Sequence, residues 1–461
     1  MSLTDLFDRH PELEFHGVVV LRRGALLLER TWAPYRSDDL ALVYSVSKTF
    51  TATAVGLAIA EGRFALTDRI VTLLPNDVPA DVDERTRQIT VHHLLSMSTG
   101  HDVDTREAID GAPEAEWARR ILSMAPATPV GSRHVYNNGA SFLLGEVIRQ
   151  HTGLDVLEYL RPRLFEPLGI SATWDRDGLG RCFGWSGLHL TTAGLAAMGE
   201  LYRCDGVWNG TRLLPEGWVR TATTAQIPTA PDDQPEWRLG YGYQLWLGRE
   251  GYRLDGAFGQ YAIVLPEREL VIGITSSQEH TQRVMDFVFD ELVPQLPEHP
   301  ELLPDGQLWT PDDTGLVGSW SATEAGFDPD LAIEPDAEQL NLPTVVDLSA
   351  HAEPEAGGER PRFAVRFVID SGAVELTARP GGWIRQRLPL AEAEVPVAVT
   401  AGTQPDGSLL VLVVFTDTPH TLRLRLAGDG TAGLAWRTSP LHAGSVDRLQ
   451  AGAPHDQALA R

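Results

Sequence analysis

Ser45 and Lys48 lie three residues apart in the stretch YSVSK, where a strongly apolar segment begins. If a helix begins near Ser45, both side chains project from one face of its first turn. A serine hydroxyl becomes a nucleophile when a neighbour accepts its proton, and the free N–H groups at a helix start can stabilise an oxyanion. The pair therefore indicates a nucleophilic serine with a lysine base.

Lys48 is also the only lysine among 38 basic residues, and all the others are arginine. A guanidinium stays protonated at any usable pH, whereas a buried ammonium can lose its proton and act as a base. The Ser-x-x-Lys spacing alone is weak, because it arises by chance in chains of this length. A single lysine at this spacing is a much stronger indication.

Tyr136 and Asn138 form a Tyr-x-Asn pair just before a predicted helix. A tyrosine near an ammonium can have a lowered pKa and shuttle protons. The amide of Asn138 can hold a substrate carbonyl group and the lysine head group. The alternative for this segment is an Asn-Gly turn with a surface tyrosine.

Gly256 and Gly259 mark a third segment, at a predicted strand start where the backbone approaches another group closely. Such a strand edge could present the N–H of Ala257 as a second oxyanion donor. The alternative is an ordinary glycine-containing hairpin.

Strands at both ends of the first 300 residues position these candidates. Residues 15–32 read as a hairpin, and residues 239–276 contain three apolar runs typical of strands. Residues 47–62 are apolar on all sides, as in a helix buried at a domain centre. Residues 67–198 read as helices and loops, and residues 281–292 have helical spacing. The pattern predicts an α+β fold, an antiparallel sheet flanked by helices with an inserted helical subdomain.

The composition divides the chain into two domains. Residues 1–300 form the first, with the helical subdomain at about 67–200, and a Pro-rich acidic linker follows at 301–315. Residues 316–461 alternate apolar and polar types, which predicts a separate all-β module, a small barrel or sandwich.

The net charge of −25, without a basic cluster, argues against nucleic-acid or membrane-surface partners. No secretory signal and no apolar run of membrane-spanning length is present, so a cytoplasmic protein is expected. Two cysteines make no disulfide framework, although Cys182 and Cys204 could pair. The sequence leaves the oligomeric state open.

Two further sets of residues are weaker candidates. Adjacent histidines point apart on a helix and no ligand spacing recurs, so no metal site is expected at His92, His93, His101 and Asp102. An apolar cleft could be lined by tryptophans, although packing is the commoner role for Trp185, Trp237 and Trp246. No cofactor is expected.

The three ordered motifs resemble those of the serine β-lactamase and penicillin-binding-protein superfamily, and above all its class C β-lactamase-like members. The phrases TVHHLLSMSTGHD and LFEPLGI are similar to recurring phrases of that family. The resemblance covers about residues 12–295. It implies a β-lactamase/transpeptidase-like fold and a serine hydrolase that acts on small-molecule esters or amides through an acyl-enzyme.

The resemblance also implies a role for each position. Ser45 is the acylated nucleophile, and Lys48 activates it and shares protons with Tyr136, which acts as base in acylation and deacylation. Asn138 positions the substrate. Gly256 belongs to the third motif, and the N–H groups of Ser45 and Ala257 form the oxyanion hole.

One departure affects the substrate. The family's third motif usually begins with Lys or His, and the matching residue here is Leu254. A cation there helps to bind a substrate carboxylate, so weak or absent β-lactamase activity is expected unless Arg253 or another arginine compensates. The alternative function is a penicillin-binding-like sensor without turnover. The C-terminal module could bind a partner, mediate oligomerisation or cap the cleft.

Overall fold

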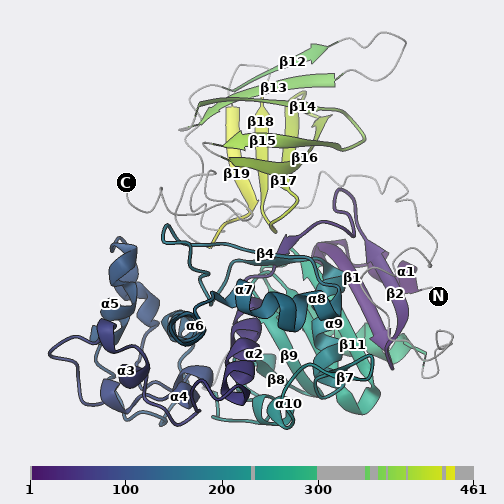
Figure 1. Cartoon of the computed structure of the whole chain (residues 1–461). Helices are drawn as coiled ribbons and strands as arrows, with labels where there is room; N and C mark the ends of the chain where they lie inside the picture. The colour runs from purple at the N-terminus through teal and green to yellow at the C-terminus, as the bar shows by residue number, and fades with distance from the viewer. Residues whose placement is uncertain are drawn as a thin grey trace.

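The computed structural model describes residues 3–229, 234–297, 348–353, 362–369, 372–390, 393–427 and 432–441. Its N-terminal part is built on a six-stranded antiparallel sheet with the order β2-β1-β11-β10-β9-β8 (Figure 1). The strands are β1 (Phe15–Arg22), β2 (Ala25–Thr31), β8 (Trp246–Gly248), β9 (Gly251–Gly256), β10 (Gln260–Leu265) and β11 (Leu270–Ser276). The first two strands thus join a sheet completed by the last four, which confirms the α+β prediction.

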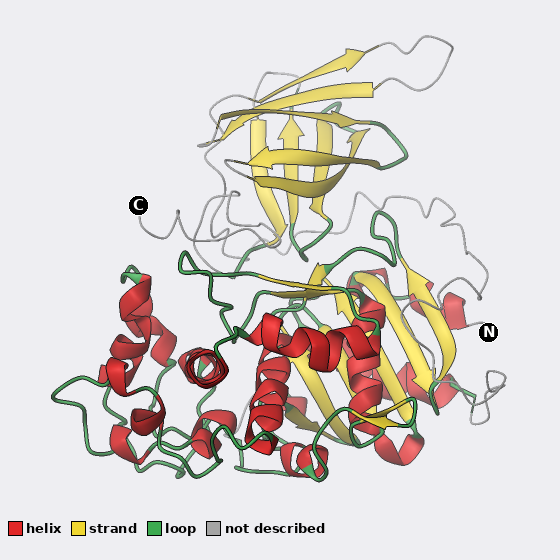
Figure 2. Cartoon of the chain, in the orientation of Figure 1, coloured by secondary structure: helices red, strands yellow, loops and turns green. Residues whose placement is uncertain are grey.

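Helices cover both faces of this sheet (Figure 2). The helices α2 (Val46–Ala60) and α9 (Thr192–Arg203) share one hydrophobic core with the sheet. On the opposite face, α1 (Leu3–Asp8), α11 (Thr281–Asp286) and the π-helix η9 (Phe287–Leu292) enclose a second core. Because alternate strand residues point to opposite faces, all eight residues of β1 are buried between the two layers.

The helix α9 lies on the sheet and not in the helical subdomain predicted to extend to residue 200. Small residues explain this close packing. A Cβ on Gly199 would lie 2.8 Å from Cγ1 of Val271, and one on Gly273 would lie 2.9 Å from Cβ of Ala196. The predicted helical range also contains two short strands, β4 (Ala172–Trp174) and β5 (Leu188–Leu190). The strand β5 pairs with β4 on one side and with β3 (Ala41–Leu42) on the other.

The remaining helices of the predicted range are α3 (Ile70–Leu73), α4 (Val91–Leu95), α5 (Trp117–Ser123), α6 (Asn138–Thr152), α7 (Val156–Leu160) and α8 (Glu166–Leu168). The longest is α6, whose predicted apolar face is buried and which ends at Gly153 in a left-handed conformation with φ of 78°. Its first residue is Asn138, so this helix positions part of the candidate site.

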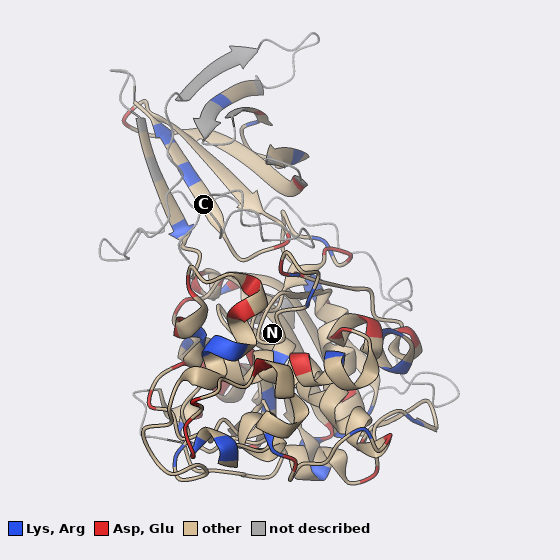
Figure 3. Cartoon of the chain, turned by 60° about the vertical axis from the view of Figure 1, so that its left-hand side comes forward, with Lys and Arg blue, Asp and Glu red and all other residues tan. Residues whose placement is uncertain are grey.

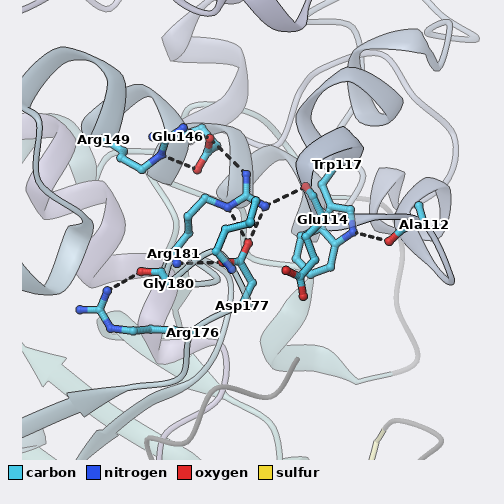
Figure 4. Close-up of polar contacts among 10 residues, drawn as sticks. Ala112, Glu114, Trp117, Glu146, Arg149, Arg176, Asp177, Gly180 and Arg181 are labelled. Carbon is cyan, nitrogen blue, oxygen red and sulfur yellow. Dashed lines mark hydrogen bonds and ion pairs between the residues drawn. The ribbon is translucent and has the colours of Figure 1, made fainter. Parts of the chain in front are cut away.

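A buried ion network ties the loop before β5 to α6 (Figure 4). The Arg181 guanidinium lies 2.5 Å from Asp177 and 3.4 Å from Glu146 of α6, and both carboxylates are at most 5% exposed. Glu146 also pairs with Arg149 at 2.8 Å, while Arg181 donates a hydrogen bond of 2.9 Å to the Glu114 carbonyl oxygen. Since the charges are satisfied within the network, it fixes the loop that carries Trp185.

Two sequence expectations about strands need correction. Most of the apolar run 240–247 is not a strand, because buried Gln244 is hydrogen-bonded to α4 instead. Its Nε2 donates to the Leu94 carbonyl oxygen at 2.9 Å, and its backbone N–H donates to the Leu95 carbonyl oxygen at 3.0 Å. Gly256 ends β9 and does not begin a strand, and Gly259 directly precedes β10.

The C-terminal part is entirely β in the residues that the structure describes, as predicted. One antiparallel sheet contains β12 (Leu348–Glu353), β13 (Arg362–Ile369) and β14 (Gly372–Ala378). The other contains β15 (Ile384–Leu390), β16 (Ala393–Thr403), β17 (Leu409–Phe415), β18 (Thr421–Leu426) and β19 (Ala432–Thr438). Val365, Leu376 and Trp436 belong to one core shared by both sheets. The predicted linker 301–315 lies outside the described residues.

Figure 3 shows charged residues of both signs interspersed along the described ribbon. Within the described ranges, no helix is long and apolar enough to cross a membrane.

Substitution of Arg181 by alanine should lower the free energy of unfolding by about 3–5 kcal/mol, because buried Asp177 loses its guanidinium partner and buried Glu146 keeps only Arg149. Urea unfolding followed by circular dichroism measures this loss. The matched control is Arg268→Ala, which removes an exposed pair with Glu250 and should cost at most about 1 kcal/mol. Equal losses in the two variants would contradict the structural role of the network.

Candidate active site

Ser45 is the N-cap of α2, with φ of −68° and ψ of −9°, so it already has helical geometry. Lys48 lies one turn further along the same helix, and its Nζ is 2.8 Å from the Ser45 Oγ. The side chains of the first motif therefore meet as the spacing predicts. The first turn of this helix therefore carries both groups.

The Lys48 ammonium group is enclosed by protein, and the side chain is 1% exposed. Its Nζ donates a hydrogen bond of 2.8 Å to the Trp185 carbonyl oxygen and lies 4.8 Å above the centre of the Tyr136 ring. Burial lowers the pKa of Lys48 to about 7, although the negative charges of Asp104 and Asp255 partly oppose this. A substantial fraction of the amine is thus unprotonated near neutral pH.

Tyr136 faces the same pair of residues, but its pKa differs from the sequence expectation. Burial raises the pKa of Tyr136 above its ordinary value, and a hydrogen bond with Ser45 only partly opposes this shift. The predicted lowering is therefore wrong, because burial has the largest effect on this phenol and the carboxylates of Asp255 and Asp104 raise its pKa further. Tyr136 stacks on Trp246, with ring centres 6.0 Å apart. It faces Ser45 as a neutral phenol, which can pass on a proton but is a poor base.

Asn138 is held by an acidic residue that the sequence analysis missed. Its Nδ2 donates to Oδ2 of Asp104 at 2.6 Å, and its backbone N–H donates to Oδ1 of the same carboxylate at 2.8 Å. Asp104 thus orients the Asn138 amide and also acts on the charge of Lys48. Its position as the N-cap of a short 3-10 helix was the only available sequence signal.

The third motif forms the turn between β9 and β10, next to the segment that leads into Ser45. A Cβ on Gly256 would lie 2.3 Å from the Val43 carbonyl oxygen, and one on Gly259 would lie 2.3 Å from the Ser276 Oγ. Only glycine permits these approaches, as the sequence suggested. Among the described residues, no carbonyl group accepts a backbone hydrogen bond from the N–H of Ser45 or of Ala257. Both N–H groups are therefore available as donors.

Two aromatic residues beside these donors have strained backbones. Tyr44, directly before Ser45, has φ of 46°, and Phe258, directly after Ala257, has φ of 62°. Left-handed conformations of this kind cost bulky residues on the order of 1–3 kcal/mol each and persist only where surrounding contacts hold them. The rings of Tyr44 and Phe258 touch edge to face, with centres 5.3 Å apart.

The third motif contains no available cation. Leu254 is fully buried in the core shared by the sheet and α2. Arg253 is 1% exposed, and its Nε donates to the Asp255 carboxylate at 2.8 Å while its guanidinium lies 4.5 Å from the Trp237 ring centre. Because its charge is paired and buried, Arg253 does not replace the missing cation. Asp255 instead adds negative charge near Lys48.

The weaker candidates have structural partners. Trp185 is buried and supplies a carbonyl oxygen to Lys48, while Trp237 and Trp246 are half-buried beside Arg253 and Tyr136. The ring of His92 bonds to the Tyr243 hydroxyl at 2.8 Å, and His93 caps α4. Cys182 and Cys204 are free thiols.

Comparisons with known proteins show the family of the chain. The model of the Beta-lactamase family matches residues 3–293. The chain is 26% identical over 250 residues to the 6-aminohexanoate-dimer hydrolase of Paenarthrobacter ureafaciens, which covers 50% of this chain and 63% of the relative. It is 25% identical over 318 residues to penicillin-binding protein 4 of Amycolatopsis lactamdurans, which covers 60% of this chain and 81% of the relative.

The octameric penicillin-binding protein homologue from Pyrococcus abyssi has a similar fold, with a TM-score of 0.51 at 16% identity, over 89% of this chain and 98% of that one. The fold and the family match are those of the serine β-lactamase and penicillin-binding-protein superfamily. The chain belongs to the Beta-lactamase family.

The acylation rate should follow the protonation of Lys48. Since only the neutral amine accepts the Ser45 proton, kcat/KM for an activated ester should rise about tenfold per pH unit below its midpoint and level off above it. The midpoint is expected at about 7. A flat profile, or a midpoint near the ordinary lysine value of 10.5, would contradict this assignment.

Proposed function

We propose that the protein hydrolyses an ester or amide of a small molecule through an acyl-enzyme on Ser45. The observation that carries the proposal is the buried Lys48 amine, 2.8 Å from the Ser45 Oγ and with its pKa lowered to about 7. An amine with this pKa is suited to general acid–base catalysis near neutral pH, because it can accept the Ser45 proton and return it.

Acylation begins with the neutral Lys48 amine. The Trp185 carbonyl oxygen can only accept a hydrogen bond, so one N–H of Lys48 remains directed at it and the lone pair can face Ser45. As Oγ attacks the substrate carbonyl carbon, its proton moves to Nζ. The carbonyl oxygen becomes an oxyanion, which the N–H groups of Ser45 and Ala257 stabilise.

The tetrahedral adduct collapses when the bond to the leaving group breaks. The leaving oxygen or nitrogen takes the proton held by Lys48, directly or through the Tyr136 hydroxyl. Water then attacks the acyl carbon while Lys48 accepts its proton by the same route. As the acyl–oxygen bond breaks, Lys48 gives that proton to the Ser45 Oγ, so the acid leaves and the neutral amine is restored. Asn138, oriented by Asp104, holds the substrate carbonyl side during both steps.

Charge in the site favours substrates that lack a carboxylate. Asp104 and Asp255 act on Lys48, while the guanidinium of Arg253 in the third motif is paired and buried. A penicillin or cephalosporin carboxylate would therefore meet no free cation at this motif. This supports an esterase, or peptidase and amidase-like, activity with weak or no β-lactamase turnover.

The direct test is active-site labelling. A fluorophosphonate should form an adduct on Ser45, identified by mass spectrometry, and Ser45→Ala should abolish both the adduct and ester hydrolysis. Ser123→Ala is the control, because this exposed hydroxyl on α5 bonds to the Arg120 carbonyl oxygen and belongs to none of the three motifs. Labelling elsewhere, or full turnover by Ser45→Ala, would contradict the proposal.

Substrate charge gives a second prediction. A neutral nitrophenyl ester and a D-amino-acid amide should be turned over more efficiently than a chromogenic cephalosporin, by about 10-fold or more in kcat/KM. Steady-state kinetics on the panel measures the ratio. Equal efficiency for the cephalosporin would contradict the charge argument, and labelling of Ser45 without turnover of any substrate would favour the sensor alternative.

A further inference from the structure

The turn Thr416–His420, which connects β17 to β18 of the C-terminal module, is buried in the N-terminal domain. We call residues 416–420 the docking turn. Turns between strands are normally exposed. Here the side chains of Thr416, Asp417, Thr418 and His420 are between 1% and 4% exposed.

The docking turn is fixed from two sides by hydrogen bonds. The backbone N–H of Leu42, three residues before Ser45, donates to the Asp417 carbonyl oxygen at 2.8 Å. The Ser277 hydroxyl, directly after β11, donates to the Pro419 carbonyl oxygen at 2.7 Å. The turn therefore sits between the segment that leads to the nucleophile and the strand behind the third motif.

His420 of the docking turn contacts Tyr44, the residue directly before Ser45. The hydrogen bonds of its ring define its tautomer. Its Nδ1 lies 3.1 Å from the Thr438 carbonyl oxygen, which can only accept, so Nδ1 carries the hydrogen. Its Nε2, 2.6 Å from the Tyr44 hydroxyl, is then the acceptor. Burial lowers the pKa of His420 to about 3, so the ring stays neutral and the arrangement does not change near neutral pH.

The His420 ring also packs against the other strained aromatic residue. Its centre is 5.4 Å from that of Phe258, at an interplanar angle of 88°. Tyr44, Phe258 and His420 thus form a closed group of rings in edge-to-face contact. One residue of the C-terminal module touches both left-handed residues that adjoin the oxyanion donors.

We propose that His420 is a positioning residue for the oxyanion hole, so that the C-terminal module is part of the active site. Tyr44 shares a peptide group with the Ser45 N–H, and Phe258 closes the turn that carries Ala257. Contacts that hold these two residues in their strained conformations therefore fix the direction of both donors. The inference rests on the proposed acyl-enzyme function.

The test uses the full chain with three variants. His420→Ala removes the acceptor and the ring, Tyr44→Phe removes only the hydroxyl, and His420→Gln offers an amide in place of the imidazole. A nitrophenyl ester reports kcat and KM, and the rate of fluorophosphonate labelling reports acylation. The matched control is Arg385→Ala, which breaks another contact between the two domains, the ion pair with Asp39 at 2.5 Å, made by β15 and not by the docking turn.

His420→Ala and Tyr44→Phe should each lower kcat and the labelling rate by roughly 10- to 100-fold, with KM changed by less than about 2-fold. The double variant should be no slower than the slower single variant, because both act through one contact. His420→Gln should recover part of the rate. Arg385→Ala should keep the wild-type kcat.

The proposal is overturned if both single variants keep wild-type kcat, or if Arg385→Ala loses as much as they do. If His420→Ala does not fold, Tyr44→Phe alone tests the proposal, since this variant keeps the ring contact with Phe258. Failure of the hydrolase function is recognised separately, because the wild-type protein would then show no label on Ser45.

Discussion

Burial of one ammonium group against a serine hydroxyl is the constraint on which the site depends. A lysine enclosed by protein is costly unless its hydrogen bonds are satisfied or its proton is lost. Here the Trp185 carbonyl oxygen, the Ser45 hydroxyl and the Tyr136 ring surround the Lys48 amine. Each comes from a different part of the chain, so the folded domain is needed to produce an amine that titrates near neutral pH.

The charges around Lys48 affect two properties of the site, the pKa of its amine and the charge of the substrate that it can bind. Asp104 and Asp255 keep the pKa of Lys48 from falling further, and Asp104 also orients Asn138. As a result, negative charge prevails in the site, since Leu254 supplies no cation and Arg253 is paired with Asp255. The residues proposed to attack a carbonyl group thus lie together, while the third motif offers no available cation for an anionic substrate.

Local spacing predicted what lies within one helix or one turn. Ser45 and Lys48 meet because three residues span a helical turn, and Gly256 was identified because a close backbone approach requires glycine. The Trp185 carbonyl group, Asp104 and the docking turn could not be found this way. Their contacts join residues distant in sequence and leave no periodic pattern. The pKa of Tyr136 was predicted in the wrong direction because burial is a property of the whole fold.

The measurement that tests this account most directly is an NMR titration of Lys48. Since the chain contains a single lysine, protein grown with lysine labelled at Cε gives one assignable signal. Its chemical shift should titrate with a midpoint near 7 in the folded protein and return to the ordinary value when the protein is unfolded in urea. A folded-state midpoint near 10.5 would show that Lys48 stays charged and cannot be the base.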